Sequence, residues 1–309
     1  PVMETVRYDT FSTLMDDFYA LREQQERVRQ RGADLLRTAT TARDRIRRKL
    51  AMQEKDYAAT QNRDQLRIYG DLITANLYRM ERGAGRLETE NFYDPEGGTI
   101  AIPLDPLLTP QQNAAKYYKR YTKAKTAEKY LAEQMALARR DLDYLESVLE
   151  ELSRAETEQD FLDIRGELRD AGFLRRQGKK EQNRPAKPLE FRTTSGFRVL
   201  VGRNNRQNDK LTRSADHRDI WLHTQKIHGS HVILCTGGRE VDDDTIVEAA
   251  KLAAWFSQAR EGANVPVDYT PVKNVKKPAG ARPGMVIYST CRTVNVAPEE
   301  GLVKKLQLS

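Results

Sequence analysis

The sequence lacks most features that mark secreted, membrane-bound or disulfide-stabilised proteins. Only two of its 309 residues are cysteines, too few for the disulfide framework of a small secreted domain. No apolar run approaches the roughly 18 residues that a membrane span needs, and no signal-peptide pattern stands at the start. We therefore expect a cytoplasmic protein with no membrane partner, in which Cys235 and Cys291 are buried, reduced thiols.

Apolar residues are scarce too, at 39 % of the chain against 31 % charged residues. That balance is too polar for one compact globule of this length and favours long, exposed helices. The formal net charge of +7 points to an anionic partner. The first residue is proline rather than methionine, so we expect a fragment of a longer chain.

Two segments carry apolar residues in alternating steps of four and three, which is the spacing of a heptad seam. They predict helices over about 12–58, with Ser12 or Thr13 as cap, and over about 111–155. Helices of similar length in one chain pair most simply as antiparallel neighbours. The first seam is Leu14, Phe18, Leu21, Gln25, Val28, Gly32, Leu35, Ala39, Ala42 and Ile46, with local weakness at Gln25 and Gly32; the second is Tyr117, Tyr121, Ala124, Glu128, Leu131, Met135, Ala138, Leu142, Leu145, Leu149 and Leu152.

The patterns predict an α+β protein, with a long antiparallel helical coiled-coil arm, a small tip module and a compact α+β domain. In the tip module we expect one helix and a hairpin-like pair of strands. The predicted parts are 1–60 for the first coiled-coil helix, 61–110 for the tip module, 111–174 for the second coiled-coil helix and a short helix, 175–187 for a basic linker, and 188–309 for the α+β domain.

The α+β domain is predicted from alternating strands and one amphipathic helix. The stretch "LEFRTTSGFRVLVG" alternates around a Ser-Gly turn and predicts a hairpin. The stretches "DIWLH" and "SHVILCT" predict two further strands, and "GMVIYSTCRTVNV" predicts extended chain. The helix is expected in "DDDTIVEAAKLAAWFSQAR", where acidic residues at the start suit the helix dipole.

One of the two tryptophans lies in "DIWLHTQKIHGSHVIL", residues 219 to 234. Strand alternation places Asp219, Trp221 and His223 on one face, with Ile220 and Leu222 on the other. An exposed tryptophan beside basic groups can stack a base or a sugar. Alternatively, Trp221 fills a second, smaller core. The first reading predicts that replacing Trp221 or His223 with alanine lowers RNA affinity in a domain that stays folded.

All four histidines, including His217 and His228, fall within fifteen residues, which also allows a metal-site or catalytic reading. His223 and His231 can approach across the turn at Gly229. The sequence has no CxxC, no HExxH and no nucleophile-elbow pattern around Ser230. We therefore expect no enzyme activity, no metal and no cofactor, and keep a histidine-based metalloenzyme as the weaker alternative.

Two further stretches combine amides and cations in the pattern of a phosphate-contacting surface. They are "NNRQNDKLT" and "VKNVKKPAGARPG", each of which can also be a solvated loop. Their candidate RNA-binding residues are Asn204, Asn205, Arg206 and Lys210 in the first and Lys273, Lys276, Lys277 and Arg282 in the second.

Several long motifs in one order make the chain resemble the NFACT family. They are "YGDLITANLYRM", "NFYDPEGGTIAIPLDPLLTPQQNAAKYYKRYTKAK", "DIWLHTQKIHGSHVIL" and "VPVDYTPVKNVKKPAGARPGMVIY", and they span nearly the whole chain. The resemblance implies that 188–309 is the family's RNA-binding domain, NFACT-R. Its matching positions are Asp219, Trp221, His223, Gly229, Ser230 and His231.

The resemblance also implies a role in rescuing stalled ribosomes. The expected partners are the large ribosomal subunit with its rRNA, and tRNA, with no small-molecule substrate. Such a protein supports C-terminal alanine tailing of stalled nascent chains without making bonds itself. The family's N-terminal domain and helix-hairpin-helix segment are expected to be missing, with residues 1–11 as their last trace. An older family name, fibronectin-binding protein, supplies the alternative of a surface adhesin.

Overall fold

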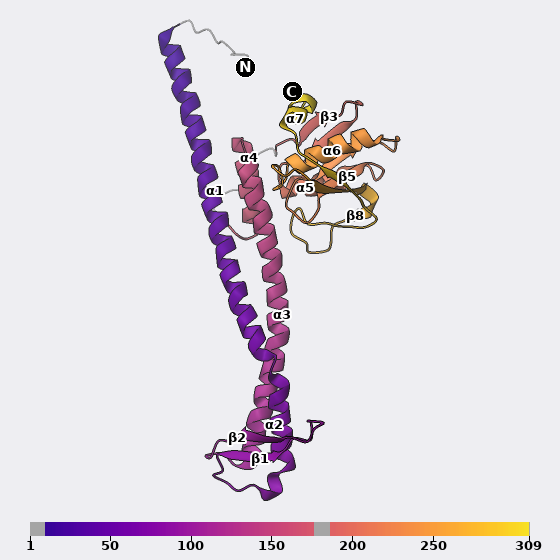
Figure 1. The fold of residues 1–309 in the computed structure, drawn as a ribbon. Coiled ribbons are helices and arrows are strands. Elements are labelled where there is room, and N and C mark those ends of the chain that lie inside the picture. The colour runs from indigo at the N-terminus through magenta and orange to yellow at the C-terminus, as the bar shows by residue number, and fades with distance from the viewer. Residues whose placement is uncertain (1–9, 176–185, 309) are drawn as a thin grey trace. The chain divides into compact units, whose positions relative to one another are not determined.

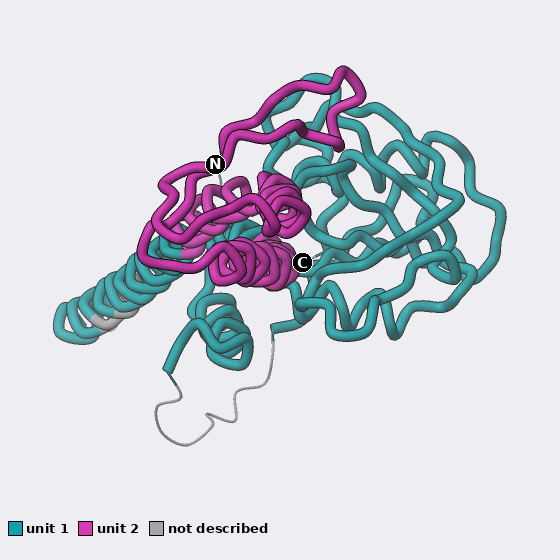
Figure 2. Tube along the Cα trace, turned by 90° about the horizontal axis from the view of Figure 1, so that it is seen from below, with its two compact units in different colours: residues 1–45, 141–309 teal, residues 46–140 magenta. Residues whose placement is uncertain are grey.

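The structure is a computed structural model that describes residues 10–175 and 186–308. It divides into two compact units, residues 1–45 with 141–309 and residues 46–140, which are coloured separately in Figure 2. The basic linker predicted at 175–187 lies almost entirely outside the described residues. Long helices and antiparallel sheets confirm the α+β class (Figure 1). None of the described helices has the length and hydropathy that a membrane span requires.

The unit of residues 46–140 contains the antiparallel helix pair. It holds the end of α1 (Phe11–Thr60), α2 (Arg63–Ala75), the short 3-10 helix η1 (Leu77–Arg79) and most of α3 (Pro110–Arg154). Glu54 forms an ion pair with Arg139 at 2.9 Å, and farther along Arg63 pairs with Glu128. From Glu54 to Arg63 the residue number rises, whereas the partner on α3 changes from Arg139 to Glu128. The two helical segments therefore run antiparallel, as predicted.

The predicted hairpin of the tip module is also present in this unit. Strand β1 (Arg86–Glu90) pairs antiparallel with β2 (Thr99–Pro103). A small core forms where the hairpin packs on α2 and the start of α3, and its buried side chains are Leu72, Ile73, Leu87, Ile102, Ala114 and Tyr117. Thr109 and Gln112 cap the start of α3 through reciprocal bonds between side chain and backbone.

The two predicted seams differ in how much of each is covered. Every predicted position of the α3 seam is buried or half-buried. In α1 the prediction is wrong at Leu14 and Phe18, which are 40 % and 53 % exposed, and no described side chain of this helix is buried before Leu35. The predicted caps, Ser12 or Thr13, are also wrong. Thr10 caps the start of α1, and its backbone and side chain exchange hydrogen bonds with those of Thr13.

The glycine that interrupts the α1 seam has a packing role. A Cβ at Gly32 would lie 2.9 Å from the Phe161 ring of α4 (Glu158–Asp170). Arg31 also forms an ion pair with Glu158 at the start of α4. The position predicted to be weak is therefore where α4 packs closely against α1.

The C-terminal part of the other unit is built on one six-stranded antiparallel sheet. Its strands are β3 (Leu189–Arg192), β4 (Arg198–Val201), β5 (Ile220–Thr224), β6 (Val232–Cys235), β7 (Val265–Pro271) and β10 (Arg292–Val296), in the order β10-β7-β5-β6-β4-β3. The predicted β3–β4 hairpin is confirmed, and the two strands predicted on either side of the turn at Gly229 are present and pair as β5 and β6.

Both faces of this sheet are covered, and alternation sorts the side chains between them. Leu222 and its neighbours pack with α6 (Asp243–Trp255) and α7 (Glu300–Leu306) in the larger core. Trp221 points to the opposite core, with Leu211 of α5 (Asn205–Ser214). Residues 272–288, which include η2 (Val272–Asn274), β8 (Val275–Lys276) and β9 (Ile287–Tyr288), complete that second cover.

The cysteines do not fit the predicted pair of buried thiols. Cys235 at the end of β6 is half-buried, and Cys291 is exposed. Burial raises the pKa of the Cys235 thiol to about 11. Cys291 lies in the short link between β9 and β10, which leaves it outside both cores.

Candidate nucleic-acid interface

The rings of the histidine-rich turn form one aromatic cluster. Trp221 stacks on His223 with 5.6 Å between ring centroids and contacts His231 edge-on at 5.2 Å. Tyr288 of β9 lies 4.8 Å away on a tilted plane. His223 and His231 themselves meet edge-on at 5.6 Å, so the predicted approach across the turn is confirmed.

Trp221 is fully buried, and the predicted exposed stacking surface is therefore wrong for this residue. It fills the smaller core with Leu211, Ile233 and Val272, which was the alternative left open by the sequence. Its indole Nε1 has no hydrogen-bond partner in the described part of the chain. A base cannot reach the ring without opening this core.

The two histidines of the cluster are held neutral. Desolvation lowers the pKa of His223 to about 4, against a smaller opposing effect of the Gly229 backbone. It lowers the pKa of His231 to about 3, where the neighbouring His223 acts in the same direction. His231 also shares a 2.8 Å hydrogen bond between its Nδ1 and Thr212 Oγ1. Neutral rings contribute no charge to phosphate binding near pH 7.

Three other predicted contacts are engaged inside the domain. Asp219 is 6 % exposed, and its Oδ1 accepts a 2.8 Å hydrogen bond from the Gly237 N–H. Ser230 is 1 % exposed, donates to the Gly202 carbonyl at 2.6 Å and accepts from Arg154 at 2.8 Å. Gly229 approaches Ser257 closely, since a Cβ there would lie 2.8 Å from the Ser257 Cβ. Their roles in this conformation are structural.

The stretch 204–212, predicted to contact phosphate and with a solvated loop as the alternative, forms the N-cap and most of helix α5. Asn204 is its N-cap, and its side chain accepts a 2.9 Å hydrogen bond from the Gln207 N–H. Asn205 donates to Ser147 Oγ at 2.9 Å and to Glu167 Oε1 at 3.2 Å. Both asparagines are 4 % exposed, so neither presents its amide to solvent.

Arg282 also contacts the chain itself rather than open solvent. Its guanidinium lies over the rings of Tyr144 and Phe173, 5.5 Å and 5.3 Å from their centroids. Nη2 of the same side chain donates to Asp141 Oδ1 at 2.6 Å. Lys277 of the same loop forms an ion pair with Asp209. This loop therefore anchors the sheet domain on the last turns of α3.

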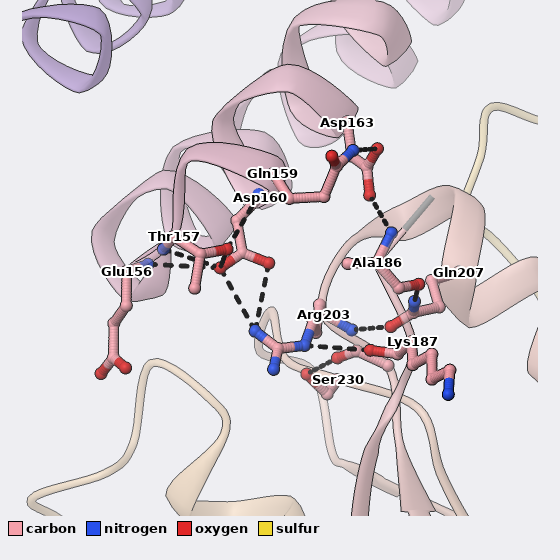
Figure 3. Close-up of polar contacts among 11 residues, drawn as sticks. Glu156, Thr157, Gln159, Asp160, Asp163, Ala186, Lys187, Arg203, Gln207 and Ser230 are labelled. Carbon is pink, nitrogen blue, oxygen red and sulfur yellow. Dashed lines mark hydrogen bonds and ion pairs between the residues drawn. The ribbon is translucent and has the colours of Figure 1, made fainter. Parts of the chain in front are cut away.

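The short helix α4 is joined to the start of the sheet domain by a polar network (Figure 3). Arg203 Nη1 lies 3.2 Å from both carboxylate oxygens of Asp160, which also closes the capping box with Thr157. Asp163 accepts a 2.9 Å hydrogen bond from the Ala186 N–H, and Gln207 donates to the Ala186 carbonyl at 2.7 Å. Helix α4 and α5 are thereby held as neighbours.

Sequence reasoning missed a group of buried ionisable residues beside this network. Glu167 is fully buried and accepts hydrogen bonds from Tyr144 Oη at 2.9 Å and from the Arg206 N–H at 3.2 Å. Burial raises the pKa of Glu167 and raises that of the neighbouring Glu151 well above its usual value. The two glutamates lie on different helices, Glu151 on α3 and Glu167 on α4, so no local sequence pattern indicates that they are neighbours.

Several cations, most of them exposed, gather beside the network, in a groove between α4 and α5. It encloses about 650 Å³ and is lined by Arg165 and Arg169 of α4, by Arg206 and Lys210 of α5, and by Lys187 ahead of β3. Of the fourteen predicted RNA-binding residues, the exposed ones are Arg206, Lys210, Lys273, Lys276 and Lys277. The structure thus brings Arg206 and Lys210 together with cations that the sequence did not single out.

The histidines do not assemble a metal site. Within residues 10–175 and 186–308, no group of three or more His, Cys, Asp or Glu side chains has the arrangement of a metal centre. His228 Nε2 instead lies 3.7 Å from Asp143 Oδ1, in the last part of α3. The turn therefore contacts α3 through His228 rather than converging on an ion.

Residues 2–187 match the family described as NFACT N-terminal and middle domains, and residues 187–289 match the NFACT protein RNA binding domain. The chain belongs to the NFACT family. Strands β3 to β7, with α5 and α6, thus lie in the NFACT RNA-binding segment, and β10 and α7 follow it in the chain. Helices α1 to α4 lie in the NFACT N-terminal and middle segment.

Several curated NFACT relatives are similar over almost the whole chain. "Rqc2 homolog RqcH" of Bacillus subtilis is 42 % identical over 99 % of this chain and 54 % of the relative. "Rqc2 homolog RqcH" of Streptococcus pneumoniae is 35 % identical over 98 % of this chain and 54 % of the relative. The chain therefore spans about half the length of these relatives.

One solved structure has a similar fold. The C-terminal part of the fibronectin/fibrinogen-binding protein from Streptococcus suis superposes with a TM-score of 0.73 at 30 % identity, covering 92 % of this chain and 100 % of that one. "Coiled-coil domain-containing protein 25" of Bos taurus is 27 % identical over 37 % of this chain and 57 % of its own.

Proposed function

We propose that this chain is the RNA- and ribosome-binding part of a bacterial ribosome quality-control factor. It binds large ribosomal subunits obstructed by a stalled nascent chain, together with tRNA, and thereby supports C-terminal alanine tailing in the cytoplasm. The similarity to RqcH along 99 % of the chain carries this proposal. The match of 187–289 to an RNA-binding domain and the exposed cations of the α4–α5 groove support it.

The proposed activity is binding rather than catalysis. The ribosome's own centre joins the residues of the tail, and this chain holds the partners in place. The two histidines nearest to Trp221 have lowered pKa values and are packed against rings, which is poor placement for proton transfer at neutral pH. We accordingly propose no cofactor and no small-molecule substrate.

Sedimentation with isolated ribosomal subunits tests the proposal. We expect the chain to pellet with large subunits at low salt and to be released as salt rises, since phosphate contacts weaken with counterion concentration. Small subunits serve as the matched control and should retain much less of the chain. Absence of pelleting with large subunits at low salt contradicts the proposal.

A second candidate function is binding of fibronectin or fibrinogen. One observation favours it, namely the likeness to the Streptococcus suis protein named for that binding. Immobilised fibronectin tests it directly, with serum albumin as control. Saturable binding to fibronectin together with no binding to large subunits would reverse the order of the two candidates.

A further inference from the structure

The groove between α4 and α5 is built from two parts of the chain that belong to different family segments. Arg165 and Arg169 come from α4, inside the segment that matches the NFACT N-terminal and middle domains. Arg206 and Lys210 come from α5, inside the RNA-binding segment. The groove therefore exists only where these two segments pack together. The contacts Asp160–Arg203 and Asp170–Arg206 join them.

The charges in the groove are not balanced. Of the described residues that line it, five are cationic and two, Asp163 and Asp170, are acidic. Asp163 already accepts hydrogen bonds from Gln159 and the Ala186 N–H, and Asp170 pairs with Arg206. Among the described residues, Arg165 and Lys210 are exposed and have no acidic partner. One such cation stands on each wall.

The remaining lining indicates what kind of anion fits. Leu162, Leu200 and Leu211 supply apolar surface, and none of the described lining residues is aromatic. A volume of about 650 Å³ lies in the range of sites that hold a small ligand or a segment of a polymer. Without rings for base stacking, the groove can attract phosphates but has little means to select bases.

We propose that the α4–α5 groove binds the phosphate backbone of single-stranded RNA, with Arg165 and Lys210 contacting phosphates from opposite walls. This proposal rests on the proposed RNA binding. It adds that the RNA-binding surface is composite, because it is formed by α4 and α5 together. Part of the affinity then comes from α4, outside the segment that matches the RNA-binding domain. Binding is salt-dependent and nearly independent of base sequence.

The test measures binding of the full chain to a short fluorescent oligouridine at several salt concentrations. Oligouridine forms no internal pairs and stacks weakly, so phosphate contacts dominate. The plot of log affinity against log salt has a negative slope. Each lost phosphate contact should make this slope shallower, reducing its magnitude by roughly 0.7 to 1. We expect that decrease for Arg165→Gln and for Lys210→Gln, and about twice that decrease for the double variant.

Two further variants separate charge at this place from other causes. Arg165→Lys keeps the charge and should keep the wild-type slope. If the guanidinium had a purely structural role, Arg165→Lys would change the slope as Arg165→Gln does. Arg213→Gln removes an exposed cation on α5 that does not line the groove, and it should change the slope much less. Circular dichroism checks that each variant is folded.

The outcomes distinguish this proposal from the broader one. If the wild type binds oligouridine with a steep salt slope while Arg165→Gln and Lys210→Gln match it, the groove is excluded and RNA binding stands. If Lys210→Gln alone lowers the slope, the composite surface is excluded. If the wild type binds neither oligouridine nor large subunits at low salt, both proposals fail.

Discussion

The histidine turn and the α4–α5 groove lie in the same unit and differ in almost every physical respect. The turn is conspicuous in the sequence, with Trp221 beside several histidines, yet its indole is buried and burial lowers the pKa of His223 and His231. The groove is inconspicuous in the sequence, yet its described lining has more cations than acids, and four of those cations, Arg165, Lys187, Arg206 and Lys210, are exposed. The cluster that is conspicuous in the sequence thus belongs to the smaller core around Trp221. The candidate RNA-binding surface is formed by cations that are far apart in the sequence.

The largest expected contrast between the two regions is in stability. Trp221→Ala removes a fully buried ring and should lower the free energy of unfolding by about 3–5 kcal/mol. Lys210→Gln alters an exposed side chain of the groove and should stay within about 0.5 kcal/mol. Urea denaturation of both variants measures the difference. A folded Trp221→Ala protein with wild-type stability and reduced RNA affinity would restore the view of an exposed stacking surface.

The loop that covers the histidine turn provides the next contrast. Gly284 has φ +79°, and a Cβ there would lie 2.0 Å from Asn205 Oδ1, an amide held by Ser147 and Glu167. Gly280 of the same loop has φ +72° but nothing within 4 Å. Gly280→Ala should therefore cost about 1 kcal/mol from backbone strain alone.

Gly284→Ala carries the same strain and also displaces a buried, hydrogen-bonded amide. We expect it to cost about 1–3 kcal/mol more than Gly280→Ala in the same urea titration. Equal losses for the two variants would show that the close approach to Asn205 adds nothing to stability.

The neutral histidines predict a dependence of stability on pH. The folded pKa of His223, about 4, lies below its ordinary value of 6.5, so protonation favours the unfolded chain. The stabilisation is complete above pH 6.5 and is lost as pH falls from there toward 4. Between pH 7.5 and 5, the wild type should lose about 2 kcal/mol more than His223→Gln. His217→Gln, at an exposed ring, should follow the wild type, and a parallel decline of His223→Gln would contradict the assignment.

The smallest expected effect is on RNA affinity at the turn. His223→Gln removes a neutral, partly enclosed ring and should change affinity for oligouridine at pH 7.5 less than about twofold, below 0.5 kcal/mol. Fluorescence anisotropy measures it beside Arg165→Gln. A larger loss in His223→Gln than in Arg165→Gln, at equal stability, would move the interface back to the histidine turn.

Much of the fold could be predicted because it depends on local periodicity. The four-three spacing along α3, the alternation of β5 and the Ser-Gly turn between β3 and β4 each record a local geometry. The α1 seam failed at Leu14 and Phe18 because a seam is covered only where another element reaches it. The helix pattern likewise did not explain Gly32, which is needed because Phe161 of α4 packs closely against it.

The candidate site was predicted less well, because exposure is not a local property. Alternation correctly separated Trp221 from Leu222, but it could not show that α5 and residues 272–288 cover the second face of the sheet. The asparagines at 204 and 205 looked like surface amides and are a helix cap and a buried contact to Glu167. Lys210 was identified as a surface cation, whereas Arg165 was not identified at all.

The sequence by itself determined the long helices, most of the strands, the β3–β4 hairpin and the resemblance to the NFACT family, since each depends on the order and spacing of residues along the chain. Only the tertiary structure decided which polar groups meet solvent. Helix α5 and residues 272–288 bury Trp221. Hydrogen bonds such as Asp160–Arg203 and Asn205–Glu167 join segments about 40 residues apart. The same contacts bring Arg165 and Lys210 to opposite walls of one groove, a proximity that no stretch of sequence contains.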